Sequence, residues 1–245
     1  MGAYSENIPK GMLTVNGKSL LECQIGKLRE IGISDIVIVT GYRAEMIRFG
    51  GVTYFHNPQF AETNMVETLM CAMEALDTDI LISYADILYT SELASMVAGC
   101  GYDIGVAVDE AWRDYWMFRY GTTETDLESL NVSGEGKITE IGRPVESSVG
   151  LNYRYIGLIR FSALGISRAI ELHGRKRSRD EGWIQSGKPL VRGYMTDLLH
   201  ELMLSGEDVR PVITRGGWME FDTIEDYKKA LAMSESGMLS SLFNL

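Results

Sequence analysis

Short apolar runs alternate with helical patterns along the first half of the chain. The run at residues 35–40, DIVIVT, consists of β-branched residues without polar alternation, which is typical of a strand buried on both faces. Residues 19–31 before it carry Leu21, Ile25 and Leu28 at helical spacing, behind a Ser19 cap. Similar runs predict strands at residues 52–55, 79–84 and 103–108, with helices at 65–76 and 91–97 between them. This order predicts an α/β fold with a mostly parallel central sheet flanked by helices.

The pattern changes after residue 108. Strands at residues 137–141 and 153–161 predict a small antiparallel extension, and the polar segment HGRKRSRDEG at 173–182 predicts a mobile loop. Helices at 163–172, 192–204 and 223–233, with strands at 209–213 and 218–222, complete the predicted elements. We therefore expect one domain over residues 1–245, with a core at about 1–110 and 190–235 and an extension at about 111–189.

The charge and cysteine content narrow the function classes. The 245 residues carry a net charge of -11, which argues against general nucleic-acid binding. No signal peptide and no apolar run of membrane-spanning length is visible in the sequence. Cys23, Cys71 and Cys100 are odd in number and lack metal-ligand spacing, which is typical of a reducing compartment. These features predict a cytoplasmic protein without nucleic-acid or membrane partners.

Two carboxylates and a lysine stand out as candidates for chemistry. Asp86 follows a predicted strand in LISYADILY, and ligands of open α/β sheets bind outside the carboxyl ends of strands. Asp222 has a similar setting in GGWMEFDT, although either residue could simply cap a turn or helix. Together they predict a shared Mg²⁺ site, because Mg²⁺ takes one or two protein carboxylates beside phosphates and waters. Lys10, in Pro-Lys-Gly, is either a solvated lysine or a charge that faces a nucleotide phosphate.

Six segments in order resemble one known family. They are PKGMLTVNGKSLLE, IVIVTGYRAEMI, NPQFAETNMVETL, ISYADILY, YIGLIRFS and GGWMEFDT. The chain resembles the nucleotidylyltransferases that activate sugar 1-phosphates or small phosphorylated alcohols, and most of all the phosphocholine and aminoethylphosphonate cytidylyltransferases. The resemblance implies a Rossmann-like nucleotidyltransferase fold. It also implies that an acceptor phosphate or phosphonate attacks the α-phosphorus of a nucleoside triphosphate bound with Mg²⁺ and releases pyrophosphate.

The resemblance also implies roles for particular residues. Asp86 and Asp222 take the metal-carboxylate positions, Lys10 takes the phosphate-binding position, and Asn64 lies where this branch contacts base or ribose. The family normally opens with a buried strand and a Gly-rich loop ahead of the Pro-Lys, whereas this sequence begins at Met1-Gly2. We therefore expect the loop to be absent and its neighbouring strands to keep unpaired edges. A truncated or non-catalytic nucleotide-binding module stays open as an alternative.

The acceptor is expected to lie against the extension. Trp116, in an aromatic segment, and Tyr155 could surround an amine, and Asp197 could pair with it. Arg175 could close over the acceptor phosphate. The alternatives are core packing or a homodimer contact for the aromatic segment, and solvated surfaces for Asp197 and Arg175. The aromatic residues favour CTP with an amine-bearing acceptor. A sugar-1-phosphate nucleotidylyltransferase that uses UTP or dTTP is the alternative within the same class.

Overall fold

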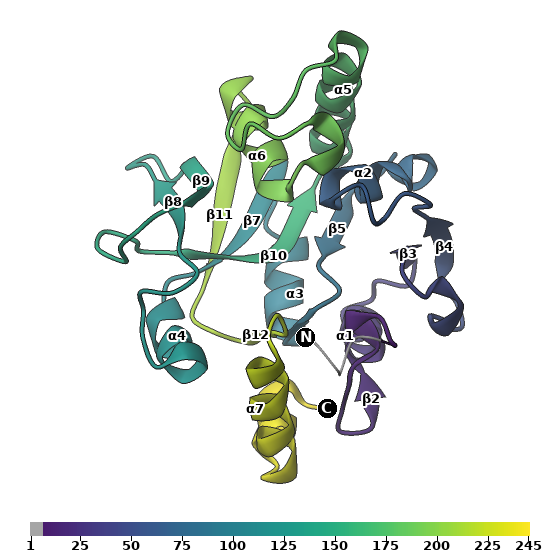
Figure 1. Ribbon diagram of the computed structural model, residues 1–245, viewed down its shortest axis with the longest axis vertical. Coiled ribbons are helices and arrows are strands. Elements are labelled where there is room, and N and C mark those ends of the chain that lie inside the picture. Colours follow the sequence, from purple (N-terminus) through teal and green to yellow (C-terminus); the bar gives the residue numbers. More distant parts are fainter. Residues whose placement is uncertain (1–6) are drawn as a thin grey trace.

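A four-stranded mixed sheet lies at the centre of the computed structural model, which describes residues 7–245 (Figure 1). Its strand order is β11-β7-β10-β5. These strands are β11 Val209–Thr214, β7 Ile104–Asp109, β10 Arg154–Phe161 and β5 Ile80–Ser83. Strands β7 and β11 are parallel, and β10 is antiparallel to both of its neighbours.

The prediction of a mostly parallel sheet is therefore wrong, although the α/β class is right. Strand β10 was expected in the antiparallel extension, but it lies in the middle of the sheet, between β7 and β5. A parallel neighbour needs a crossover connection, whereas β10 follows the antiparallel hairpin of β8 Glu128–Val132 and β9 Ile138–Pro144. Strand direction depends on that connection, and the residue pattern of the strand itself does not reveal it.

Smaller pairs of strands surround the central sheet. Strands β3 Val37–Thr40 and β4 Thr53–His56 are parallel, while β6 Ile87–Tyr89 and β12 Trp218–Glu220 are antiparallel. A short hairpin joins β1 Thr14–Val15 to β2 Lys18–Ser19. Within residues 7–245, β3 pairs with β4 alone and β5 with β10 alone. Each of these two strands thus has one edge without a strand partner among the described residues.

Several helices begin at the capping residues that the sequence predicts, although α2 Met65–Met70 ends before the expected end at residue 76, and α4 Trp112–Tyr120 was not predicted as a helix. The bounds of the helices are α1 Leu20–Glu30, α2 Met65–Met70, α3 Ser91–Ala98, α4 Trp112–Tyr120, α5 Ala163–Arg179, α6 Met195–Leu204, α7 Ile224–Glu235 and α8 Met238–Phe243; the 3₁₀ turns are η2 Lys10–Met12, η3 Ala44–Met46, η4 Met73–Ala75 and η5 Leu190–Arg192. Ser19 Oγ accepts a hydrogen bond from the Glu22 amide of α1 at 3.2 Å. Gly32, at φ 85°, supplies the left-handed residue that follows the helix.

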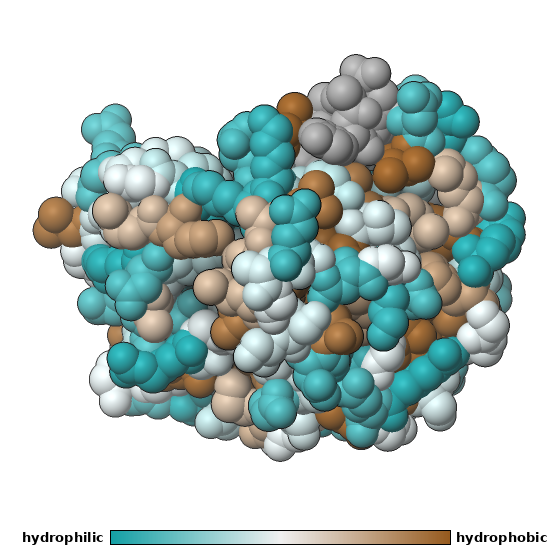
Figure 2. All heavy atoms as spheres, turned by 90° about the horizontal axis from the view of Figure 1, so that it is seen from below, coloured by the Kyte–Doolittle hydropathy of each residue, from teal (hydrophilic) through white to brown (hydrophobic). Residues whose placement is uncertain are grey.

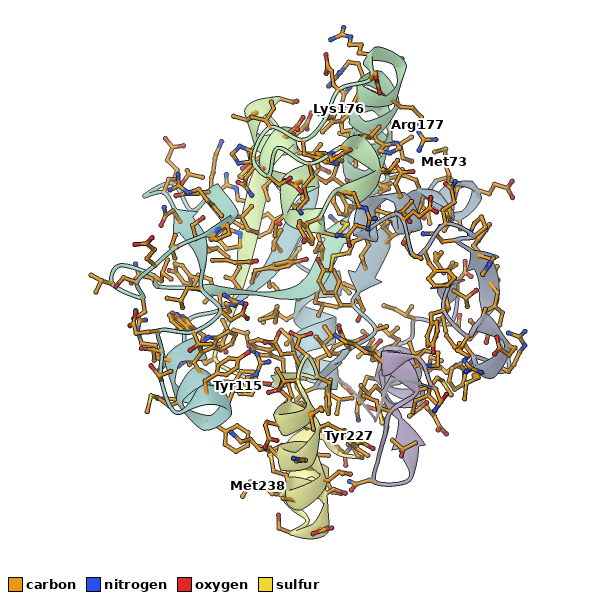
Figure 3. All side chains as sticks on the ribbon, in the orientation of Figure 1. Met73, Tyr115, Lys176, Arg177, Tyr227 and Met238 are labelled. Atoms are coloured by element: carbon orange, nitrogen blue, oxygen red, sulfur yellow. The ribbon has the colours of Figure 1, made fainter. Side chains whose placement is uncertain are left out.

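The prediction of a mobile loop at residues 173–182 is wrong for most of that segment, because helix α5 continues through Arg179. Lys176 is buried and its Nζ donates to both carboxylate oxygens of Glu201 in α6, at 2.8 and 2.6 Å. Buried His173 and exposed Arg177 both contact the carboxylate of Glu67 in α2. In Figure 3, Arg177 lies on the side of α5 that approaches α2. These ion pairs attach the segment to α2 and α6.

The core covers both faces of the central sheet. Residues of α2, α5 and α6 pack in one buried cluster, and residues of α3 and α4 pack in a second. A third cluster joins α1, β12, α7 and α8. No helix among residues 7–245 is both long and apolar enough to span a bilayer. The face seen in Figure 2 is a mosaic of hydrophilic and hydrophobic residues.

Candidate active site

The antiparallel pairing of β6 with β12 brings the two predicted carboxylates together. Asp86 lies between β5 and β6, and Asp222 follows β12. The Phe221 amide donates a hydrogen bond to the Asp86 carbonyl at 2.9 Å, one residue beyond the last strand pair. Asp86 is therefore positioned at the carboxyl end of β5, and Asp222 lies beside it although it is distant in sequence.

Lys10 lies between these carboxylates. Its Nζ is 3.1 Å from Asp86 Oδ2 and 3.0 Å from Asp222 Oδ1. Burial opposes the charged ammonium, but attraction by Asp86 and Asp222 outweighs it and raises the pKa of Lys10. Burial, with the like charge of Asp222, raises the pKa of Asp86 although Lys10 opposes that shift. The three side chains thus form a charged cluster with one negative charge in excess.

Gly11 allows the turn η2 to approach Asp86 closely. A Cβ at Gly11 would lie 2.8 Å from Leu21 Cγ and 3.1 Å from the Ala85 carbonyl oxygen. A glycine is therefore required where the backbone before Asp86 passes the turn that carries Lys10. Beside Lys10 lies an open pocket of about 400 Å³, whose lining includes Ile38, Thr40 and Tyr42.

The carboxylate pair fits the chemistry of Mg²⁺ binding. Both ligands are hard oxygen donors, they are partly exposed, and a cation already lies between them in the form of the Lys10 ammonium. Among residues 7–245, no group of three or more His, Cys, Asp or Glu residues is gathered as a metal site. Two carboxylates alone are sufficient where substrate phosphates and waters complete the octahedron.

A buried arginine fixes the loop that carries Asp222. Arg119 of α4 donates from Nε to Asp226 Oδ1 at 2.8 Å and from Nη2 to Asp226 Oδ2 at 2.7 Å. Asp226 Oδ2 also accepts hydrogen bonds from the amides of Asp222 and Thr223, at 3.2 and 2.9 Å. Arg119 also contacts Glu220. Arg119 thus connects α4 to the candidate metal ligand through the first turn of α7 and through β12.

The structure gives Asn64 and Tyr155 partly exposed positions. Asn64 is the N-cap of α2, and its Oδ1 accepts from the Met65 amide at 2.9 Å. Glu67, three residues after Asn64, contacts α5 instead of completing a capping box with Asn64. The Tyr155 hydroxyl donates to the Tyr84 hydroxyl at 3.0 Å. Tyr84 itself lies two residues before Asp86 in sequence.

The three remaining residues that were predicted to bind the acceptor are Trp116, Asp197 and Arg175. Trp116 is 0% exposed, its Nε1 donates to the Thr125 carbonyl, and its ring has no surface to offer a substrate. Asp197 is 1% exposed and accepts from the Ser186 and Tyr194 amides, so it caps α6. Arg175 is exposed on α5. Trp116 therefore packs in the core, as the alternative interpretation of the aromatic segment expected. Asp197 is buried, so the alternative interpretation of it as a solvated surface residue does not hold.

Sequence reasoning missed Tyr84 and Arg119, which contact the predicted residues Tyr155 and Asp222. The position of Tyr84 just before Asp86 is a signal that could have identified it. Tyr115 of α4, labelled in Figure 3, accepts a hydrogen bond from the Glu220 amide at 2.9 Å. No local pattern separates Arg119 from ordinary charged surface residues, because its partners Glu220 and Asp226 lie far away in the sequence.

Comparison with known proteins identifies the class. Residues 1–149 match the MobA-like NTP transferase domain, and the chain belongs to that family. It is 27% identical over 229 residues to CTP:phosphoglutamine cytidylyltransferase of Campylobacter jejuni, covering 89% of each chain. It is 35% identical over 89 residues to choline-phosphate cytidylyltransferase of Streptococcus pneumoniae, covering 35% of this chain and 39% of the relative.

A solved structure supports the same fold. The structure of CTP:phosphocholine cytidylyltransferase from Streptococcus pneumoniae superposes with a TM-score of 0.71 at 21% identity, covering 95% of this chain and 92% of that one. The protein is therefore a nucleotidylyltransferase-family enzyme with the α/β fold of that cytidylyltransferase. A nucleoside triphosphate and a phosphorylated acceptor are the substrates that the family implies.

Proposed function

We propose that the protein transfers CMP from CTP to a small phosphorylated alcohol or phosphonate and releases pyrophosphate. The observation that carries this proposal is the Lys10 ammonium between Asp86 and Asp222, at the carboxyl end of β5. Relatives named for phosphoglutamine, phosphocholine and aminoethylphosphonate support CTP and a small acceptor. Phosphocholine and 2-aminoethylphosphonate are the acceptors to test first.

The reaction is an in-line displacement that depends mainly on positioning and charge. The acceptor oxygen is already ionised at neutral pH, so the chain has no need of a general base. Asp86 and Asp222 would hold Mg²⁺, which when bound neutralises and polarises the phosphate groups. Lys10, whose side chain is 40% exposed, can reach from the carboxylates to a phosphate. We place the nucleotide in the pocket beside Lys10, with Asn64 as a candidate contact for base or ribose.

A sugar-1-phosphate nucleotidylyltransferase is the second candidate. A UTP–glucose-1-phosphate uridylyltransferase of Haloferax volcanii is 26% identical over 99 residues, or 38% of this chain. That alignment is shorter than the one with the phosphoglutamine enzyme, which spans 229 residues. The first candidate therefore has the broader support.

Pyrophosphate release with Mg²⁺ tests both candidates. CTP, UTP, dTTP, ATP and GTP are each combined with phosphocholine, 2-aminoethylphosphonate, phosphoglutamine and several sugar 1-phosphates. We expect release with CTP and one small acceptor. Release with UTP or dTTP and a sugar 1-phosphate would instead establish the second candidate. Nucleotide binding without release from any pair would contradict both and favour a non-catalytic module.

A further inference from the structure

Gln24, a buried residue of α1, contacts the backbone on both sides of Asp86. It is 5% exposed and lies among the residues that α1 buries. Its Nε2 donates to the Tyr84 carbonyl at 2.8 Å and to the Ile87 carbonyl at 2.5 Å. Both donor hydrogens of the amide are used, which offsets the cost of burying a polar group. One side chain of α1 thus spans the turn that carries the candidate metal ligand.

The two acceptors determine what kind of side chain this position requires. Both partners of the Gln24 Nε2 are carbonyl oxygens, which only accept hydrogen bonds. The reverse orientation of the amide would place Oε1 against these two acceptors, so the nitrogen faces the turn. A protonated carboxyl group has one hydrogen to donate, and a thioether has none. The position therefore needs a side chain with two donor hydrogens on one atom, which Gln24 provides.

The Ile87 carbonyl lies on the side of β6 that has no neighbouring strand. Among residues 7–245, β6 pairs with β12 alone, and the Phe221 amide donates to the Asp86 carbonyl on that side. Successive carbonyls of a strand point to opposite edges, so the Ile87 carbonyl points away from β12. A buried carbonyl without a donor is unfavourable. Gln24 therefore takes the place of a neighbouring strand at the free edge of β6.

Helix α1 also positions the lysine of the candidate site. Leu21, three residues before Gln24, packs against Gly11, where an added Cβ would lie 2.8 Å from Leu21 Cγ. Gly11 follows Lys10 in turn η2, and the Lys10 Nζ is 3.1 Å from Asp86 Oδ2. Residues three apart in sequence are neighbours on the surface of a helix. One face of α1 therefore holds the two turns that carry Lys10 and Asp86.

We propose that Gln24 is a positioning residue, which holds Asp86 in the geometry that Mg²⁺ binding requires. The proposal rests on the proposed function, because it takes Asp86 as a metal ligand. Gln24 acts through its two backbone contacts and supplies no ligand of its own. Without these hydrogen bonds the turn moves more freely, and the Asp86 carboxylate spends less time beside Asp222. Groups that orient a metal ligand typically contribute about 10- to 100-fold in metal affinity or activity.

The Mn²⁺ affinity of Gln24→Met tests this role without substrate or turnover. Mn²⁺ takes the same oxygen ligands as Mg²⁺, and the free ion is measured by its electron paramagnetic resonance signal. Met keeps the length of the side chain and removes both donors. We expect the dissociation constant for Mn²⁺ to rise about 10- to 100-fold. Denaturant unfolding establishes beforehand that the variant is folded, so the change reports on the metal site and not on lost stability.

Gln185→Met is the matched control. Gln185 Nε2 donates to the Ile141 carbonyl at 2.8 Å, so this variant loses a hydrogen bond of the same kind elsewhere in the chain. Its Mn²⁺ affinity should equal that of the wild type. Equal losses of affinity in Gln185→Met and Gln24→Met would show a general effect and overturn the proposal.

Two asparagine variants complete the test. Gln24→Asn keeps the amide but is one methylene shorter, so it cannot span both carbonyls and should weaken Mn²⁺ binding by less than Gln24→Met. It also provides the measurement if Gln24→Met does not fold, and wild-type affinity in the folded Gln24 variants would overturn the proposal. If Asp86→Asn weakens Mn²⁺ binding and the Gln24 variants do not, only the positioning role fails. If Asp86→Asn has no effect, the metal site and the proposed function fail with it.

Discussion

The charges of Asp86, Asp222 and Lys10 act as a unit at the scale of single residues. Asp86 has a 25% exposed side chain and Asp222 a 46% exposed one, so the pair is accessible to a nucleotide. The Lys10 ammonium reduces the repulsion between the carboxylates, and it lies within 3.1 Å of both. Each member therefore influences the others, and single substitutions in this cluster will not have additive effects.

Asp86→Asn is expected to abolish most of the turnover. The amide keeps the side-chain volume but removes the negative charge that we propose binds the metal beside the reacting phosphates. We expect kcat to fall about a hundredfold to a thousandfold or more, the range for lost electrostatic stabilisation. Pyrophosphate release with CTP and the best acceptor measures it. Asp77→Asn, an exposed aspartate without a described side-chain partner, is the control, and normal turnover in Asp86→Asn would contradict the assignment.

Glu67 predicts a pH-dependent contribution to stability. Burial opposes its charge, but hydrogen bonds from His173 and Arg177 outweigh it and lower the pKa of Glu67 below 4.5. A lowered folded-state pKa stabilises the fold fully above the unfolded value, and the contribution is lost as pH falls through the folded value. Glu67→Gln should therefore destabilise the protein by about 1–3 kcal/mol at pH 7, because charged hydrogen bonds are lost.

Denaturant unfolding across pH measures this contribution. The difference between the wild type and Glu67→Gln should shrink in acid as Glu67 takes up its proton. Glu74→Gln, an exposed glutamate of η4, should show little difference at either pH. If the loss in the free energy of unfolding caused by Glu67→Gln stayed constant down to strongly acidic pH, it would come from altered packing and not from the lost charge.

Local signals predicted several of the elements, because those signals lie within the elements themselves, but α4 and β8 were not predicted. The Ser19 cap and the Gly32 terminus of α1 are examples, as is the buried run of β7. The position of β10 in the sheet could not be predicted, because the connections between strands determine which strands become neighbours, and the residue pattern of a strand does not. The continuation of α5 was missed because its charges look solvated in sequence. Lys176 and Arg177 are paired with Glu201 and Glu67, which are remote in sequence.

Helix α4 and the Asp222 loop should be uncoupled by Arg119→Met. The Arg119 side chain is 1% exposed and that of Asp226 is 3% exposed, so the change leaves a buried carboxylate unpaired. We expect a loss of about 3–5 kcal/mol in the free energy of unfolding. Denaturant titration measures it. Arg113→Met, on the same helix with one described side-chain hydrogen bond to the Ser148 carbonyl, should cost much less. Equal costs would show that Arg119 has no special role.

The candidate site exists only in the folded molecule as a whole. Lys10, Asp86 and Asp222 lie on η2, between β5 and β6, and after β12, so no local sequence pattern could place them together. The family resemblance predicted the grouping that the residues alone left open. Arg119 was missed because its relevance depends on contacts between distant elements. A ligand that requires this grouping will bind the folded state and not the unfolded chain.

Mg²⁺ should therefore stabilise the whole fold, and more so when Lys10 no longer competes with it. In Lys10→Met the two carboxylates face each other without a cation, which lowers stability in the absence of metal. Mg²⁺ can then bind without displacing an ammonium. We expect it to add about 1–3 kcal/mol at about ten to a hundred times its dissociation constant, and less in the wild type.

Thermal unfolding of Lys10→Met with and without Mg²⁺, at matched ionic strength, measures that linkage. Lys10→Met combined with Asp222→Asn should lose the excess stabilisation, because one of the two carboxylates is gone. Equal Mg²⁺ effects in the wild type and Lys10→Met would mean that the metal binds elsewhere. A greater effect in Lys10→Met alone would mean that the ammonium and the metal share one site, which the fold builds from three distant parts of the chain.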